Sequence, residues 1–329
     1  MISPNVDHLD LAQRPIVNSL LLLSLFFSFT VFASTDTTNT TSTHEIQSIK
    51  IIPSSKLDFR SHEYYSSLLK LALDKTANEY GEAKLVETEG KMMQDRAFNG
   101  LSSRSTIDVF WSVTSASREA QSIPIRVPLL EGIMGYRVSL IRKLDTHKFA
   151  NTNELRKLIA GQGHDWPDLE ILSANGYLVW GASDYDSLID LLRKKRIDYF
   201  PRAINEVVTE YNYHQDPTLA IESQYLLHYP SFMFFFVSQN SPELAERIER
   251  GLQLAKADGS FNDLFEQYID LAILNATLDL SNRTILTLQN PFHSIKTRQL
   301  SECFRYEGPI AALIDERAPL SEAACAYLK

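Results

Sequence analysis

The chain has 329 residues, of which 44% are hydrophobic and 22% are charged, a composition typical of a folded globular protein and not of a disordered or fibrous one. Its formal net charge of −9 at pH 7 would repel a phosphate backbone, so we do not expect a nucleic-acid partner. Two cysteines are too few for a Cys-rich zinc site or for the disulfide framework of a small secreted domain.

The N-terminal segment has the layout of a secretory signal peptide. Residues 15–33 are uncharged and mostly apolar, follow Arg14, and end on Ala33, a small residue that suits a cleavage site. The alternative is an uncleaved membrane anchor, because the stretch approaches the length that spans a bilayer. We expect cleavage after Ala33, so that residues 1–33 form a signal peptide, residues 34–45 form a linker, and the mature protein lies outside the cytoplasm.

Strand and helix patterns alternate over the first part of the mature chain. Alternating or continuous apolar runs predict strands at residues 46–53, 83–86 and 106–111. Apolar residues spaced three and four apart predict helices at residues 64–73 and 91–98. Such alternation is typical of a sheet with helices on its faces.

The same alternation continues to residue 273. The expected strands are residues 135–142, 177–180, 197–200 and 231–237. The expected helices are residues 153–159, 167–174, 185–195, 242–256 and 261–273. Two α/β units in series are implied. The strands at 135–142 and 231–237 lie at the two junctions between them, where a pair of crossover strands would act as a hinge.

The C-terminal part of the chain is assigned only in part. Residues 280–288 are expected to form one further strand that packs on the first unit. Residues 291–329 are a tail with no predicted structure. This tail contains both cysteines, and Cys303 and Cys325 could form a disulfide in an oxidising compartment or remain free thiols.

Residues 232–269, FMFFFVSQNSPELAERIERGLQLAKADGSFNDLFEQYI, resemble the closing segment of extracellular solute-binding proteins of family 3. Proteins of that family end with an apolar hinge strand, a polar turn, a long helix, an ADGS or ADGT motif and an aromatic-rich last helix. Residues 108–142 are similar to the family's first-lobe exit. In the family's second lobe, a Gly-x-x-Gly-Thr loop before a helix is similar to Gly161-Gln162-Gly163, which the resemblance therefore places in a loop, and a strand is similar to residues 196–200. The resemblance covers residues 46–273, most of the mature chain.

The resemblance implies an α/β fold of the type 2 periplasmic binding protein class, a two-lobed clamshell with two crossover hinge strands. Lobe 1 would comprise residues 46–135 and 231–290, and lobe 2 would comprise residues 136–230. The family implies a periplasmic protein that closes on a small-molecule solute, often an amino acid, and usually delivers it to the permease of an ABC importer.

The ligand site of such a fold is expected where helix N-termini with unpaired backbone N–H groups meet the carboxyl ends of strands. Four segments qualify, at residues 53–60, 112–118, 161–167 and 201–206. The candidate ligand-binding residues in or beside these segments are Arg60, Trp111, Ser112, Thr114, Arg118, Gly163, His164, Trp166, Arg202 and Glu206.

Arg118 and the two tryptophans have defined expected roles. Arg118 lies near the position of the arginine that grips a ligand carboxylate in the amino-acid binders that the chain resembles, and a guanidinium fork suits that task. The alternative is a solvated arginine at a helix start. Trp111 and Trp166 could clamp a ring or an alkyl chain, although Trp111 could equally be a core residue.

Arg202 departs from the pattern of that family. Amino-acid binders generally place an aspartate there, which pairs with the ligand ammonium group, whereas this chain has Pro201-Arg202-Ala203. A cation at this place would repel an ammonium group. We therefore expect a small polar or anionic solute, unless Glu206 takes over the role of the aspartate.

Catalysis has little support in the sequence, which contains no G-x-S-x-G, H-E-x-x-H or P-loop motif. The pair His164-Asp165 is more typical of a loop hydrogen bond than of a catalytic dyad. We therefore expect a monomeric binding protein with no enzymatic activity, no cofactor and no metal. Two alternatives stay open: an enzyme of the same fold, such as a cyclohexadienyl dehydratase, and a sensory protein that presents its ligand to a membrane receptor.

Overall fold

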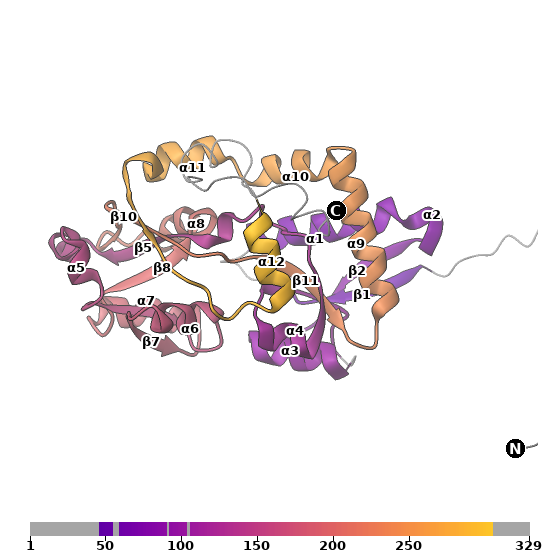
Figure 1. Ribbon diagram of the computed structural model, residues 1–329, viewed down its shortest axis with the longest axis horizontal. Coiled ribbons are helices and arrows are strands. Elements are labelled where there is room, and N and C mark those ends of the chain that lie inside the picture. Colours follow the sequence, from indigo (N-terminus) through magenta and orange to yellow (C-terminus); the bar gives the residue numbers. More distant parts are fainter. Residues whose placement is uncertain (1–45, 55–58, 91, 104–105, 305–329) are drawn as a thin grey trace, which may run out of the picture. The chain divides into compact units, whose positions relative to one another are not determined.

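The computed structural model describes residues 46–54, 59–90, 92–103 and 106–304 (Figure 1). All of them belong to one compact unit, His44–Lys329. The signal peptide and the linker expected at residues 1–33 and 34–45 lie outside the described residues, as does the tail beyond residue 304. Within the described residues, none of the helices combines the length and the apolar character that a membrane span requires.

Two small sheets and the helices around them form what we call lobe 1. Its strands are β1 (Gln47–Ile51), β2 (Ala83–Glu87), β3 (Val109–Val113), β4 (Ser122–Ile125) and β11 (Met233–Ser238). Its helices are α1 (Phe59–Lys75), α2 (Ala77–Tyr80), α3 (Gln94–Ser103), α4 (Ala116–Gln121), α9 (Pro242–Ala257) and α10 (Ser260–Tyr268). One sheet pairs β1 with β2 in parallel, and the other places β11 antiparallel between β3 and β4.

A larger sheet and its helices form what we call lobe 2. The strands are β5 (Tyr136–Arg142), β6 (Ile159–Gly163), β7 (Leu178–Ala182), β8 (Tyr199–Ala203), β9 (Leu219–Ile221), β10 (Tyr225–His228) and β12 (Thr284–Thr287), in the order β12-β10-β5-β8-β6-β7 with β9 also on β5. The helices are α5 (Thr152–Leu155), α6 (Pro167–Ala174), α7 (Tyr185–Arg193) and α8 (Ile204–His214), with the short 3-10 helices η1 (Ile133–Gly135) and η2 (Lys143–Phe149). Three further elements follow α10, namely α11 (Leu271–Leu278), η3 (Leu280–Asn282) and, beyond β12, α12 (Ile295–Cys303).

The central strands of both lobes are covered on both faces. Every residue of β3, β5, β8 and β11 is buried, which fits the nearly continuous apolar sequence of β11. On lobe 1, α1 and α9 pack closely, because Gly251 of α9 has no side chain and its Cα approaches the backbone of Ala72. A Cβ at Gly251 would overlap that backbone.

Helix starts follow local signals in the sequence. Pro167 and Pro242 stand in the first turns of α6 and α9, where the missing N–H has no intrahelical partner to lose. Asp184 caps α7 by accepting from the backbone N–H of Ser187 at 2.8 Å. These helices therefore lie where the sequence predicts them.

Two predictions about β6 were wrong. The helix expected at residues 153–159 ends at Leu155, and Ile159 opens β6. The glycines at 161 and 163 were interpreted as loop residues, but both lie in the strand. A Cβ at Gly161 would collide with the side chain of Ile197, and one at Gly163 would lie 2.5 Å from the ring of Trp166. Glycine is needed here for close packing and not for a turn.

The C-terminal part departs from the expected course at two points. The single helix expected at residues 261–273 is divided at Ile269 and Asp270 into α10 and α11. The strand expected within residues 280–288 exists as β12, but it pairs in parallel with β10 of lobe 2 and not with a strand of lobe 1, so its expected location was wrong. The other residue boundaries of the lobes, at 135/136 and 230/231, stay a prediction.

Candidate functional site

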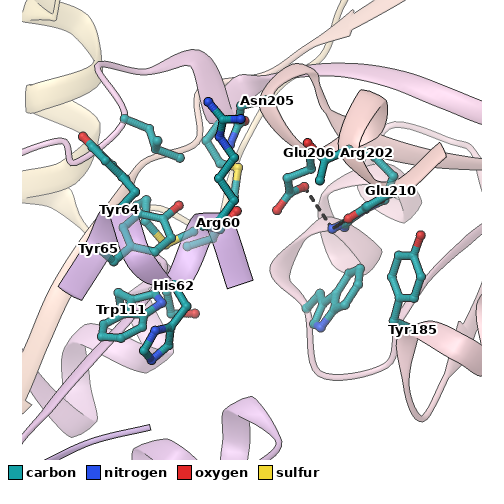
Figure 2. A pocket seen from close by; sticks show the side chains of 18 of the residues that line it. Arg60, His62, Tyr64, Tyr65, Trp111, Tyr185, Arg202, Asn205, Glu206 and Glu210 are labelled. Carbon is teal, nitrogen blue, oxygen red and sulfur yellow. Dashed lines mark hydrogen bonds and ion pairs between the residues drawn. The ribbon is translucent and has the colours of Figure 1, made fainter. Parts of the chain in front are cut away.

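A cavity of about 970 Å³ is lined by residues of both lobes (Figure 2). Lobe 1 contributes the start of α1 and part of β3, and lobe 2 contributes the loop after β6, the end of β8 and part of α8. The volume is in the range of small-molecule sites in proteins. Six of the residues predicted to bind ligand line the cavity: Arg60, Trp111, Ser112, Trp166, Arg202 and Glu206.

The lobe 1 side of the cavity is an aromatic wall. Tyr65 and His62 of α1 pack against Trp111 of β3, with ring centroids 5.6 and 5.2 Å apart. Tyr64 lies beside Tyr65, and its hydroxyl donates to the carbonyl of Leu129. Burial raises the pKa of both tyrosines, so their phenols are neutral at physiological pH. Trp111 belongs to this wall and also to the hydrophobic core.

Arg202 faces this wall and is held by two glutamates (Figure 2). Its Nε and Nη2 donate to the carboxylate of Glu210 in α8 at 2.8 and 2.6 Å. Glu206, one turn earlier in α8, has a carboxylate oxygen 3.0 Å from Nη2. Burial alone would lower the pKa of Arg202, but Glu206 and Glu210 raise it. Arg202 is therefore charged, and the protein itself supplies its counter-charges.

Aromatic rings enclose the guanidinium of Arg202. Its Cζ lies 4.9 Å from the ring centroid of Trp166, 5.1 Å from Phe200 and 5.7 Å from Tyr185. Such contacts favour a cation over the ring faces. Trp166 lies against Gly163, which is buried in β6 and does not line the cavity.

A second arginine, Arg137, lies in β5 and also lines the cavity. Its Nη2 is 2.8 Å from Oδ1 of Asp168, and these side chains are only 3% and 5% exposed. Its Nη1 is 3.8 Å from Glu206, and its guanidinium lies over the ring of Tyr229 at 5.5 Å. The hydroxyl of Tyr229 also donates to Asp168. Because Glu206 lies near Arg137 and Arg202, it joins the two ion pairs into one cluster.

Arg118 was predicted to bind a ligand carboxylate, but all four of its hydrogen bonds go to acceptors within the protein. Nη1 donates to the hydroxyl of Ser112 and the carbonyl of Val113, each at 2.7 Å. Nη2 donates to Oε1 of Gln94 at 2.6 Å and to the carbonyl of Asp165 at 2.7 Å. Burial lowers the pKa of Arg118 to about 10, which still leaves it charged at neutral pH. Arg118 is not among the residues that line the cavity.

Asp165, whose carbonyl accepts from Arg118, also joins the two lobes through its side chain. The Asp165 carboxylate, from the loop after β6, accepts from the backbone N–H groups of Gln94 and Asp95 at 3.0 and 3.4 Å. These groups open α3 of lobe 1 and have no acceptor within their helix. A lobe 2 side chain therefore caps a lobe 1 helix, and Arg118 of lobe 1 binds the same residue.

Two further predicted residues lie away from the cavity lining. The hydroxyl of Thr114 is buried and donates to Glu119 at 2.7 Å. His164 is exposed, and its Nδ1 lies 3.0 Å from the carbonyl of Ala182. The cysteine at the end of α12, Cys303, is disulfide-bonded. Cys325 lies outside the described residues, so its pairing with Cys303 stays a prediction.

The charges around the cavity are mostly negative. Seven carboxylates and three arginines line it within the described part of the chain. The carboxylates belong to Asp165, Asp168, Asp184, Asp186, Glu206, Glu210 and Asp270, and the arginines are Arg60, Arg137 and Arg202. Burial raises the pKa of Glu210, while Arg202 opposes that shift. Even with Glu210 protonated, carboxylates would remain in excess.

Sequence reasoning missed three members of the central cluster, namely Arg137, Asp168 and Glu210. Arg137 stands in the mostly apolar segment YRVSLI of β5, and a charge in a buried strand is a signal that a partner must exist. The partner itself, Asp168, is far along the chain and could not be identified. Across the described residues, no group of three or more His, Cys, Asp or Glu side chains is arranged to hold a metal ion.

No family model and no curated protein sequence matches the chain. Several solved structures are similar to the chain in fold. An ancestral arginine-binding protein bound to arginine has 14% sequence identity and a TM-score of 0.53, over 69% of this chain and 100% of the other. A periplasmic arginine-binding protein of Salmonella typhimurium has 13% identity and a TM-score of 0.51, over 67% and 98% of the two chains. The periplasmic VFT2 domain of BvgS from Bordetella pertussis has 12% identity and a TM-score of 0.54, over 68% and 93%.

These likenesses concern the fold. They span nearly the whole length of the other chains, although few residues are identical. The α/β architecture, the crossovers between the lobes from β4 to β5 and from β10 to β11, and the cavity lined by both lobes agree with them. The fold expected from the sequence resemblance is thus confirmed: the chain has the two-lobed fold of the type 2 periplasmic binding proteins.

Proposed function

We propose that the protein is a secreted, periplasmic solute-binding protein that encloses a small polar solute by movement of its lobes, for delivery to an ABC permease. The observation that carries this proposal is the cavity of about 970 Å³ lined by side chains of both lobes. A solute bound there touches both lobes, so its binding favours the arrangement in which they are close.

The charges of the lining favour a solute with a positive group over the anionic solute that Arg202 suggests in the sequence. Arg202 and Arg137 each have carboxylate partners within the protein, so an anion would have to compete with Glu206 and Asp168. The excess of carboxylates attracts a cation, and the ring of Trp111 offers an additional favourable surface. The two arginine-binding proteins of the same fold are named for a solute of this class.

The test is a solute screen on the mature protein. Thermal shift and calorimetry would compare cationic amino acids and polyamines with neutral amino acids and dicarboxylates. We expect the cationic solutes to bind and to raise the midpoint of unfolding. Selective binding of dicarboxylates would contradict the proposed solute class, and no binding by any polar solute would contradict the proposed function.

A substitution of Glu206 tests whether this carboxylate contributes to the binding of a cationic solute. Glu206→Gln keeps the shape of the side chain but removes one negative charge that both arginines share. We expect the affinity for the best cationic solute to fall roughly tenfold or more, as for loss of one charged hydrogen bond. Glu246→Gln, on the exposed face of α9, is the matched control and should leave the affinity unchanged.

We propose that the cavity binds its solute without converting it. Three of the lining carboxylates, Asp168, Glu206 and Glu210, lie within ion-pair distance of a buried arginine, so a solute would meet them as parts of ion pairs and not as free acids or bases. A solute incubated with the protein should be recovered unaltered by mass spectrometry. Delivery to a permease and presentation to a membrane receptor would use the same lobe closure. Cross-linking of the solute-loaded protein in its own membrane would separate these roles by the identity of the captured partner.

A further inference from the structure

The C-terminal strap, residues 269–303, crosses between the lobes twice (Figure 1). It leaves α10 on lobe 1, forms α11 and β12 on lobe 2, and returns to lobe 1 as α12. The crossovers from β4 to β5 and from β10 to β11 already connect the lobes. The strap therefore adds a third and a fourth connection to a fold in which the sequence predicts two.

The strap is part of the lobe 2 sheet. β12 pairs with β10 from Tyr225↔Thr284 to His228↔Thr287. Just before it, Arg283 donates from Nη1 to the carbonyl of Tyr225 at 2.9 Å and lies 3.6 Å from Glu222. The Arg283 and Glu222 side chains are each 3% exposed. Breaking a buried pair of this kind is costly, so this part of the strap stays with lobe 2.

The other end of the strap is fixed to lobe 1. Glu119 of α4 accepts from the hydroxyl of Ser294 at 2.7 Å and from that of Thr297 at 2.6 Å, both at the start of α12. Leu300 of α12 packs into the aromatic cluster of lobe 1 that includes Phe98. These contacts combine charge-assisted hydrogen bonds with apolar burial, so α12 is firmly docked.

The returning crossing runs beside the β10–β11 crossover, which we expect to act as a hinge. Asn290 donates from Nδ2 to the carbonyl of Pro230, which lies in the β10–β11 crossover, at 2.8 Å. Next to it, Gln289 and Asn175 exchange two hydrogen bonds of 2.8 and 2.9 Å. Six residues separate β12 from Ser294, the N-cap of α12. Because it is long and lies near the hinge, this crossing need not stretch when the lobes separate.

The outgoing crossing is short and lies at the cavity. Only Ile269 and Asp270 separate the end of α10 from the start of α11, and both line the cavity. Tyr268, the last residue of α10, is held on lobe 1, where its carbonyl accepts from Arg60 at 3.2 Å and its ring lies 5.7 Å from that of Tyr64. Since an extended residue spans at most about 3.5 Å, this link cannot let the lobes move far apart while α10 and α11 both stay docked.

Within the strap, α11 is the element that is held least firmly. Its sequence LAILNATL is almost wholly apolar, yet Leu278 is its one fully buried residue and Ile273 is 62% exposed. Leu271 and Leu274 of α11 pack against the core but are only partly buried, and within the described residues no hydrogen bond joins α11 to α8. Undocking α11 therefore costs less than breaking the β12–β10 pairing together with the buried Arg283–Glu222 pair. By contrast, the two-residue link cannot lengthen, and β12 cannot leave β10 without breaking their strand pairing.

We propose that the C-terminal strap limits the opening of the lobes and that α11 must leave α8 before the cavity opens widely. The two-residue link, the buried anchor at Arg283 and the weak docking of α11 together carry this proposal. It concerns the motion of the lobes, and its test uses no solute, so its outcome does not depend on what the cavity binds.

The test lengthens the link. A six-residue Gly-Ser insert between Ile269 and Asp270 would give α10 and α11 independent movement. Dyes on non-natural residues at Glu266 of α10 and Asn212 of α8, both exposed, would report the interlobe distance by single-molecule energy transfer. We expect a narrow distance distribution in the unaltered protein and, in the variant, a population that is longer by roughly 5–10 Å.

The same insert between Asn240 and Ser241, in the β11–α9 turn of lobe 1, is the matched control and should leave the distribution narrow. A point variant, Leu274→Ala, trims the partly buried face of α11 without lengthening the link, and should shift the distribution in the same direction by less. The proposal is overturned if the unaltered protein already samples the longer distance to the same extent, or if neither α11 variant differs from the control.

Discussion

At the residue scale, His293 shows how burial controls protonation in this protein. It lies in the strap, its Nε2 is 3.0 Å from Nδ2 of Asn290, and its ring stacks on Phe232 at 5.9 Å. Burial lowers the pKa of His293 to about 4, Glu119 opposes the shift, and Arg298 adds to it. The imidazole is therefore neutral in the folded protein at every pH above that value.

This shift predicts a pH dependence of stability. Between pH 6.5 and pH 4 the unfolded chain binds a proton at residue 293 and the folded protein does not, so the free energy of unfolding falls as the pH falls. The slope from this group cannot exceed about 1.4 kcal/mol per pH unit. Urea unfolding at several pH values should show a flatter dependence for His293→Gln than for the unaltered protein. His147→Gln, at an exposed histidine, is the control, and an equally steep slope in both variants would contradict the assignment.

At the residue scale the sequence indicated only part of the site. Arg202 and Glu206 could be named because both follow a predicted strand, yet the partner of Arg202 was not visible. Glu210 lies one further turn along α8, a helix that was not predicted. The sequence identified Arg118 as a candidate site residue. Its acceptors could not be predicted, because they come from three separate segments that only the tertiary fold brings together.

At the scale of elements, the packing of α1 on α9 depends on Gly251. We expect Gly251→Ala to destabilise the fold by about 1–3 kcal/mol, because the new Cβ overlaps the backbone of Ala72 and the helices must move apart. The better helix propensity of alanine, about 1 kcal/mol, offsets only part of this cost. Chemical denaturation would measure the change. Gln253→Ala, on the exposed face of α9, should change stability by less than about 0.5 kcal/mol.

Elements were predictable where a local signal and a long apolar period coincide. α6 and α9 both begin at prolines and were both found, and α9 also has a clear apolar periodicity. β6 was interpreted as a loop because glycine is typical of turns. In the structure its two glycines instead leave room for the side chains of Ile197 and Trp166, a tertiary requirement that the local sequence does not reveal. The placement of β12 was wrong for a related reason, since the four residues of a short strand do not specify which sheet edge they join.

At the scale of the whole molecule, the secretion of the chain can be tested directly. If the signal peptide is cleaved after Ala33, the exported protein begins at Ser34. N-terminal sequencing or intact mass of protein released from the periplasm should show that start. Substitution of Ala33 by a bulky residue should block processing and leave a longer, membrane-retained form. Recovery of an uncleaved chain in the membrane from the unaltered gene would support the anchor interpretation instead.

The pairing of β12 with β10 has a consequence for the order in which the protein can assemble. β10 ends at His228, but the strand that covers its outer edge is supplied by residues 284–287. While the chain is being made, lobe 2 thus has an open strand edge until more than fifty further residues have emerged. An open edge can pair with another chain. A truncation before residue 284 would leave that edge uncovered permanently, and aggregation, not loss of a surface appendage, would be its main effect.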